Sequence, residues 1–199
     1  MRPGLRPRFF AVGMAAVCTM VLGCDGGHSP RPRPGERVYH GTTPPLVVSL
    51  AYPSAWRLTE EVGSRERYAQ VHLLGPRNAE DTYTAYIAVR GVVPDGEGAM
   101  GGLDERVRRY ADELLEGTTI ESLRPTSLQH AEARDLLVAF TVPPLFHPGL
   151  KSLPIPVKTR TVFLRRGAYL YEVIYSADAR EYAAHAPAFE RVLASLRFR

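Results

Sequence analysis

The sequence has only two cysteines among its 199 residues, Cys18 and Cys24. Cys18 lies in an apolar leader that we expect to be removed, so the mature chain would keep Cys24 alone. One cysteine can form neither an intramolecular disulfide nor a thiolate cluster for a metal ion. The folded part of the chain must therefore be held together by its hydrophobic core.

Lysine is also scarce, because the sequence contains only Lys151 and Lys158. Without Arg2, Arg6 and Arg8, which belong to the leader, the 25 basic residues become 22, against 21 acidic ones. A nearly neutral chain without a basic block lacks the electrostatic footprint of a nucleic-acid-binding protein. We therefore expect no nucleic-acid partner.

Signatures of catalysis are missing as well. There is no G-x-S-x-G elbow, no H-E-x-x-H pair, no phosphate-binding loop and no dinucleotide fingerprint. The histidines are scattered, without any pair at i, i+2 or i, i+4 that would indicate a local metal site. They are His28, His40, His72, His130, His147 and His185. We expect a protein that is not an enzyme and holds no cofactor or metal. Two alternatives stay open, an envelope enzyme with a dispersed active site and a carrier of a small ligand or metal.

The first 24 residues carry the most specific pattern in the chain. A cationic start is followed by an uncharged apolar run, Phe9 to Leu22, which is typical of a secretory signal. This run is about 14 residues long, shorter than the roughly 20 that a membrane-spanning helix needs. Val21-Leu22-Gly23-Cys24 resembles the bacterial lipobox, in which the cysteine receives diacylglycerol and becomes the new N-terminus. The resemblance implies that the lipid is attached at Cys24.

Lipid chains on Cys24 would hold the protein on a membrane without spanning it, since each buried methylene contributes about 0.8 kcal/mol. We expect an extracytoplasmic location, on the periplasmic side or the surface of a bacterial membrane. The signal peptide would cover residues 1–23. Residues 24–44 are rich in Gly, Pro and Arg and predict a flexible tether. Residues 45–199 would form one globular domain.

Within this domain the apolar pattern predicts strands, a helix and one tryptophan anchor. The expected strands are residues 46–53, 68–74, 82–93, 120–128, 133–142, 157–164 and 168–176. Leu103–Glu116 has one apolar stripe and predicts an amphipathic helix. Its acids form i, i+4 pairs, Asp104 with Arg108 and Glu105 with Arg109, so we interpret them as a solvent-facing surface and not as catalytic groups. Trp56 is expected in the core.

The stretch from Val157 to Phe198 has the densest apolar patterning. Arg165-Arg166-Gly167 joins two strands into a hairpin, and the second strand is apolar on both sides, which predicts a central position in the sheet. Asp178 would cap a short helical turn, and Pro187 suits the first turn of a second helical segment. The stripe that packs this segment on the sheet consists of Phe189, Val192, Leu193 and Leu196.

The connection between Val142 and Val157 is long and rich in proline, yet it carries several large apolar side chains. Long loops tend to be functional or disordered, and the apolar content disfavours disorder. Two interpretations stay open: a flap packed over the sheet, or a loop that contacts a partner or covers a ligand. The candidate contact residues are Phe146, His147, Leu150, Leu153 and Ile155.

The two ends of the expected domain carry a family pattern. AYPSAWRL near its start and GAYLYEVIYSADAREYAAHAPAFERVLASLRF at its end resemble the PsbP-like family, which includes DcrB-like bacterial lipoproteins. The matching positions are Tyr52, Pro53, Trp56, Tyr171, Tyr175, Phe189, Val192, Ser195 and Phe198, with Leu196 where the family usually has Phe. The resemblance implies an α+β fold, with an antiparallel β-sheet flanked by helices in an α/β/α sandwich. It also implies a binding or assembly role, with an unknown envelope protein or ligand as partner.

Overall fold

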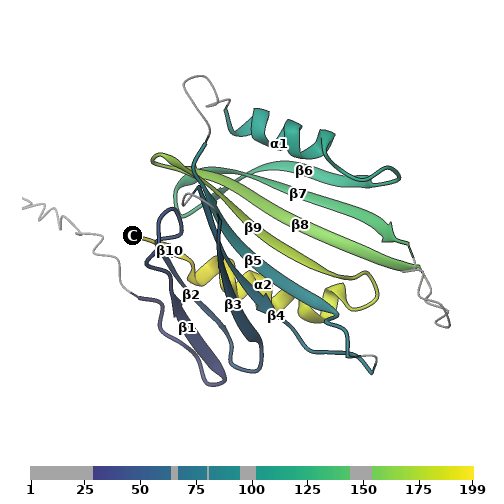
Figure 1. Ribbon diagram of the computed structural model, residues 1–199, viewed down its shortest axis with the longest axis horizontal. Coiled ribbons are helices and arrows are strands. Elements are labelled where there is room, and N and C mark those ends of the chain that lie inside the picture. The colour runs from purple at the N-terminus through teal and green to yellow at the C-terminus, as the bar shows by residue number, and fades with distance from the viewer. Residues whose placement is uncertain (1–28, 64–66, 80, 95–101, 144–153) are drawn as a thin grey trace, which may run out of the picture.

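Two antiparallel β-sheets and two helices make up the fold in a computed structural model, which describes residues 29–63, 67–79, 81–94, 102–143 and 154–199 (Figure 1). The small sheet has the order β1-β2-β10 and contains β1 (Glu36–His40), β2 (Val48–Pro53) and β10 (Arg197–Phe198). The large sheet has the order β3-β4-β5-β9-β8-β7-β6. Its strands are β3 (Arg57–Val62), β4 (Tyr68–Leu74), β5 (Ala85–Val92), β6 (Thr119–Leu128), β7 (Ala131–Val142), β8 (Ile155–Arg166) and β9 (Tyr169–Asp178). The helices are α1 (Leu103–Asp112) and α2 (Tyr182–Ser195).

The β8–β9 hairpin forms the middle of the large sheet, as its sequence predicted. Arg166 pairs with Tyr169 across a two-residue turn, in which Gly167 takes a φ of +59°. β9 lies between β5 and β8, so neither of its edges is exposed. Alternation along β9 then sends Tyr171, Val173 and Tyr175 to one face of the sheet, and Leu170, Glu172 and Ile174 to the other.

One face of the large sheet packs against α2 and the small sheet (Figure 1). The core between them includes the fully buried Tyr175 and Phe189, whose rings stack with centroids 5.3 Å apart. Trp56 is 9% exposed and belongs to the same core, as predicted. Ser195 of α2 closes this layer, because its buried Oγ accepts a hydrogen bond from the Ala51 amide of β2 at 2.9 Å.

On the opposite face of the large sheet, α1 covers one part. Leu103 and Val107 of this helix pack on Leu136, Val138 and Phe163 of β7 and β8. Helices on both faces of an antiparallel sheet confirm the predicted α+β sandwich. The sheet extends beyond the end of α1 (Figure 1), so part of this face has no helix over it.

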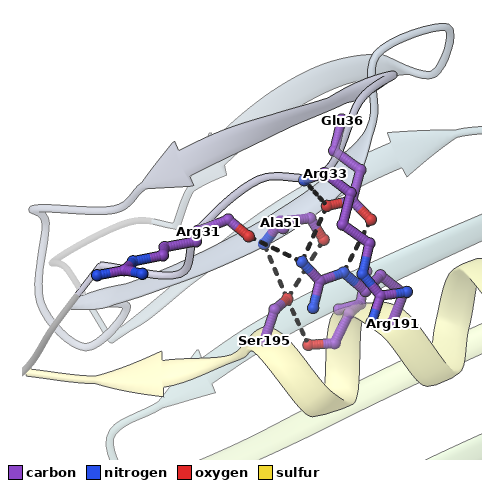
Figure 2. A network of polar contacts seen from close by, with 7 residues as sticks. Arg31, Arg33, Glu36, Ala51, Arg191 and Ser195 are labelled. Atoms are coloured by element: carbon purple, nitrogen blue, oxygen red, sulfur yellow. Dashed lines mark hydrogen bonds and ion pairs between the residues drawn. The ribbon is translucent and has the colours of Figure 1, made fainter.

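The prediction that residues 24–44 form a flexible tether is wrong for the carboxyl end of this range. β1 occupies residues 36–40 and pairs with β2 along its whole length. Even before β1 the chain is held in place: Pro30 is buried, and the Arg31 carbonyl accepts a hydrogen bond from Arg191 of α2 at 2.9 Å (Figure 2). A Pro- and Arg-rich composition hid these tertiary contacts, because the sequence shows no apolar run at this point.

Both helices depart from the prediction at their ends. α1 ends at Asp112, not at Glu116, because the next amides bond three residues back, as in Leu114 N–H to the Ala111 carbonyl. α2 is one continuous helix and not two segments, with Pro187 inside it. The proline removes one backbone hydrogen bond in the second turn. Burial of the apolar stripe that follows it offsets this loss.

One predicted ion pair on α1 is also wrong. Glu105 meets Arg109 as expected, with 3.5 Å between Oε1 and Nη2. Asp104 instead reaches across to β7, where Arg134 Nε donates to its Oδ1 at 2.6 Å. The guanidinium of Arg134 holds the pKa of Asp104 below its usual range. This acid therefore attaches the start of α1 to the sheet, a role that spacing along one helix does not reveal.

Candidate functional site

A pocket of about 280 Å³ opens where α1 ends above the large sheet. Its volume is just below the range of roughly 300–1,000 Å³ that is usual for ligand sites. The apolar part of its wall comes from the residues that follow α1 and from β7 and β9. These residues are Leu114, Leu115, Val138, Phe140 and Ile174. Val138, Phe140 and Ile174 lie together because alternate residues of β7 and β9 face the same side of the sheet as α1.

Hydroxyl groups line the rest of this pocket. Thr159 of β8 and Ser176 of β9 are directly paired in register, and Thr159 Oγ1 donates to Ser176 Oγ at 2.8 Å. Tyr86 of β5 and Tyr110 of α1 contribute phenol groups. Burial raises the pKa of both phenols above the usual value, so both stay protonated at neutral pH and act as neutral hydrogen-bond donors. Glu113 brings a carboxylate to the wall.

Apolar side chains continue outside the pocket on the same face of the sheet. Strand register shows this: Ile120 pairs with Val138, Leu123 with Leu136, and Val142 with Ile155. Four of these residues, together with Tyr86 and Leu115 of the pocket wall, are the large apolar side chains on this side that are most exposed. Their exposed fractions are Tyr86 37%, Leu115 64%, Ile120 49%, Leu123 50%, Val142 37% and Ile155 40%. We call these six residues the apolar rim. Large apolar side chains exposed on one face of a sheet are candidates for an interaction surface.

Under α1, next to the pocket, lies a buried carboxylate. Glu172 of β9 is 1% exposed, and its Oε1 accepts hydrogen bonds from Nε (2.9 Å) and Nη2 (2.5 Å) of Arg106. Arg90 of β5 lies on its other side, with 3.8 Å between Nη1 and Oε2. Because guanidinium groups occupy this carboxylate, it attaches α1 to the centre of the sheet and is not available as a base. The sequence shows it only as an acid between Tyr171 and Val173 in an apolar strand.

The described histidines have separate structural surroundings. His185 lies edge-on to Trp56, and its Nε2 is 3.4 Å from Glu181 Oε2. His72 Nε2 is 3.8 Å from Glu61 Oε2, and His40 Nδ1 contacts Arg199 at 2.9 Å. His130 occupies the β6–β7 turn with a φ of +65°. Among the described residues, no three His, Cys, Asp or Glu side chains gather as a metal site would require.

The sequence-based candidates overlap this site at one residue. Ile155 belongs to the apolar rim, at the start of β8. Cys24 and the loop residues Phe146, His147, Leu150 and Leu153 lie outside the described residues. Sequence reasoning missed the pocket itself, because its wall comes from five separate segments. One feature of the sequence could have indicated the pocket: two adjacent apolar strands each carry a hydroxyl residue, Thr159 and Ser176, on the face that α1 covers. Across the described ranges, no helix is both long and apolar enough to cross a membrane.

Comparison with known proteins identifies the fold. No family model matches the sequence, and no curated protein matches it. The solution structure of cyanobacterial PsbP (CyanoP) from Synechocystis sp. PCC 6803 is similar, with a TM-score of 0.53 and 10% identity over 83% of this chain and 93% of that one. LpqN, involved in cell envelope biogenesis of Mycobacterium tuberculosis, aligns with a TM-score of 0.48 and 16% identity over 81% of this chain and 88% of LpqN.

The likeness to CyanoP places this chain among proteins with a PsbP-like fold, as the resemblance at its two ends implied. At 10% identity the likeness shows the fold alone. Function has to be argued from the chain's own residues.

Proposed function

We propose that this protein is an extracytoplasmic lipoprotein, held on a bacterial membrane through Cys24, whose PsbP-like domain binds an envelope protein at the apolar rim. The observation that carries the proposal is the part of the α1 face that no described element covers. Burying the exposed area of its six side chains against a partner would be favourable by about 25 cal/mol per Å². A partner with an apolar segment or strand edge would fit this surface.

Membrane attachment is supported by the N-terminal pattern. The cationic start, the uncharged run to Leu22 and the tetrapeptide ending at Cys24 all agree with lipoprotein processing. The domain makes contacts close to this cysteine in sequence, because Pro30 is buried and the Arg31 carbonyl accepts a hydrogen bond from Arg191.

Binding is favoured over catalysis by the chemistry of the pocket wall. The described residues that line it include neither histidine nor cysteine, and Glu113 is their one carboxylate. The hydroxyls of Thr159 and Ser176 bond each other. Phenols with raised pKa values are donors at neutral pH, not nucleophiles. The described part of this wall can orient a bound group, and its groups do not include a thiol or imidazole that would serve as nucleophile or base.

A second function, carriage of a small amphiphile, is favoured by one specific observation. The pocket combines an apolar side, including Phe140 and Ile174, with the hydroxyl pair of Thr159 and Ser176. A ligand with an apolar tail and a polar head would satisfy both. Fluorescence of anilinonaphthalene sulfonate, with and without candidate lipids, would detect this occupant, and Ile174→Asp would abolish the signal.

Site-specific crosslinking tests the main proposal. A photoreactive amino acid replaces Leu115 in the rim or, as a matched control, Val62, which is 50% exposed on β3 at the other edge of the sheet. In envelope membranes we expect a crosslinked protein from position 115 that disappears in the Ile120→Asp background, and none from position 62. Equal products from both positions, or none from 115, would reject the rim as the binding surface.

A further inference from the structure

The floor of the pocket is one row of side chains that crosses the strands of the large sheet. Tyr86 of β5 lies opposite Ser176 of β9. Ser176 lies opposite Thr159 of β8, which in turn lies opposite Val138 of β7. Beyond the pocket the row continues to Ile120 of β6, a member of the apolar rim. Residues that lie opposite one another on neighbouring strands point to the same face, so the whole row faces the α1 side.

This row is polar at one end and apolar at the other. Thr159 donates to Ser176 at 2.8 Å, and a hydrogen bond joins Ser176 to the Tyr86 phenol. Thr159 and Ser176 are each only 6% exposed, so their hydroxyls lie at the bottom of the pocket. Val138 and Ile120 make the other end hydrocarbon. Because neighbouring strands lie about 4.8 Å apart, the row extends for roughly 19 Å from β5 to β6.

Apolar side chains beside the row complete the wall. They are Leu114 and Leu115, which follow α1, and Phe140 and Ile174 of the strands. The enclosed volume is about 280 Å³. A group the size of a water molecule takes about 30 Å³, so the pocket has room for about nine such groups. This space suits one short hydrocarbon chain with a small head, and it is too small for a lipid with two chains.

The charge in the described wall comes from one group, the carboxylate of Glu113. Basic residues adjacent to the wall in sequence pair with other acids: Arg109 with Glu105 at 3.5 Å, Lys158 with Glu121 at 2.8 Å, and Arg160 with Asp135 at 2.9 Å. The two basic residues of β8 also point to the other face of the sheet, because Thr159 between them faces the pocket. An anionic head would therefore lose water without gaining a cation, and it would meet the carboxylate of Glu113.

We propose that the pocket binds an uncharged single-chain amphiphile, with a hydroxyl or ester head on Ser176 and Thr159 and its chain lying across β7 toward Ile120. This inference deepens the second function proposed above, carriage of a small amphiphile, and names the class of its ligand. Hydroxyl groups both donate and accept hydrogen bonds, so the polar end of the row matches an uncharged oxygen-bearing head. The apolar end of the row matches the chain.

The test uses the mature chain, residues 24–199, with Cys24→Ser, so that no lipid is attached. Every member of both cores lies between Tyr39 and Phe198, so this chain retains the whole fold. Equilibrium dialysis at neutral pH measures the binding of two radiolabelled probes, decanol and decanoate. The probes share the same chain length and differ in head charge, because the carboxyl group of decanoate is ionised at neutral pH. Both are kept below the concentrations at which they aggregate.

We expect decanol to bind at least about tenfold more tightly than decanoate. Glu113→Gln should raise the affinity for decanoate about threefold and leave that for decanol unchanged. The matched control, Glu116→Gln, removes the same charge from an exposed residue outside the wall and should change decanoate binding less. Ser176→Ala should weaken decanol binding about fivefold through the lost hydrogen bond, whereas Ser127→Ala on β6 should not.

Thermal unfolding checks that each variant folds, and Tyr86→Phe takes the place of Ser176→Ala if that variant does not. Decanoate bound as tightly as decanol, equal effects of the two Glu variants, or undiminished decanol binding without the head contact would each overturn this ligand class. Amphiphile carriage itself would survive those results. Binding of neither probe would reject both. The apolar rim is tested separately, by the crosslinks from position 115.

Discussion

Arg191 of α2 and Glu36 of β1 are 155 residues apart in the sequence and form a bidentate ion pair, with Nε to Oε1 at 2.8 Å and Nη2 to Oε2 at 2.9 Å. The same guanidinium holds the Arg31 carbonyl. Figure 2 shows how this one side chain fixes the N-terminal segment along the helix. It therefore attaches the segment that precedes β1 to the domain.

Removing this ion pair should loosen the N-terminal segment. We expect Arg191→Met to lower the free energy of unfolding by about 1–2 kcal/mol, because a partly buried, charge-assisted pair and a backbone bond are lost together. Amide hydrogen exchange of residues 31–36 should speed up more than that of β9. The control is Arg109→Met, which breaks an exposed pair on α1 and should cost less than about 0.5 kcal/mol. Equal exchange rates in wild type and Arg191→Met would contradict this role.

The same pair predicts sensitivity to acid. Hydrogen bonds from Arg191 hold the pKa of Glu36 below its usual range, and those from Arg180 do the same for Asp178. A carboxyl whose pKa is lower in the folded state stabilises the fold above its unfolded pKa. That contribution disappears as pH falls from roughly 4 through the folded pKa. Urea midpoints between pH 6 and roughly pH 3 should fall less steeply in Glu36→Gln. A slope identical to wild type would show that Glu36 is not linked to folding.

The buried ion pair of Arg106 and Glu172 should be strongly coupled. We expect Arg106→Leu to cost about 3 kcal/mol, because it leaves a buried carboxylate with Arg90 alone at 3.8 Å. The double variant R106L/E172L removes both charges and should recover most of this loss. Urea unfolding of the two single variants and the double variant gives the coupling energy. A double variant whose loss equals the sum of the two single losses would contradict the coupling.

The contacts of Ser195 give a structural reason for the serine in the PsbP-like pattern near the end of the chain. It is fully buried, accepts a hydrogen bond from the Ala51 amide and donates to the Val192 carbonyl at 3.1 Å. Ser195→Ala would leave the Ala51 amide unsatisfied, at a cost of about 1–3 kcal/mol. Differential scanning calorimetry should show the lower stability, whereas Ser127→Ala on the exposed side of β6 should be neutral. A neutral Ser195→Ala would mean that another group satisfies the amide.

The elements with strong local signals were predictable from the sequence. The β8–β9 hairpin follows from Gly167 and two apolar strands, and the central place of β9 follows from apolar residues on both sides of Glu172. Residues of α2 from Phe189 onward showed their stripe clearly. Trp56, the single tryptophan, entered the core for the reason expected of a large apolar ring.

The rest depended on contacts that leave no local trace. β1 was hidden because its neighbours are rich in proline and arginine, and its strand is stabilised by β2 and by Arg191. The pocket was hidden because its wall joins residues as distant as Tyr86 and Ser176. The lipid attachment at Cys24 and the contact role of the 143–156 loop stay predictions.

Distance measurements on the lipidated protein test the account most directly. Because Cys24 would be acylated, a cysteine introduced at position 33 or 115 is the one free thiol for a fluorophore. In vesicles containing phosphatidylglycerol and an acceptor dye at the membrane surface, we predict strong energy transfer from Arg33→Cys and weak transfer from Leu115→Cys. Equal transfer from the two positions, or stronger transfer from position 115, would contradict a domain that is anchored through Cys24 beside its N-terminal segment and presents its binding surface outward.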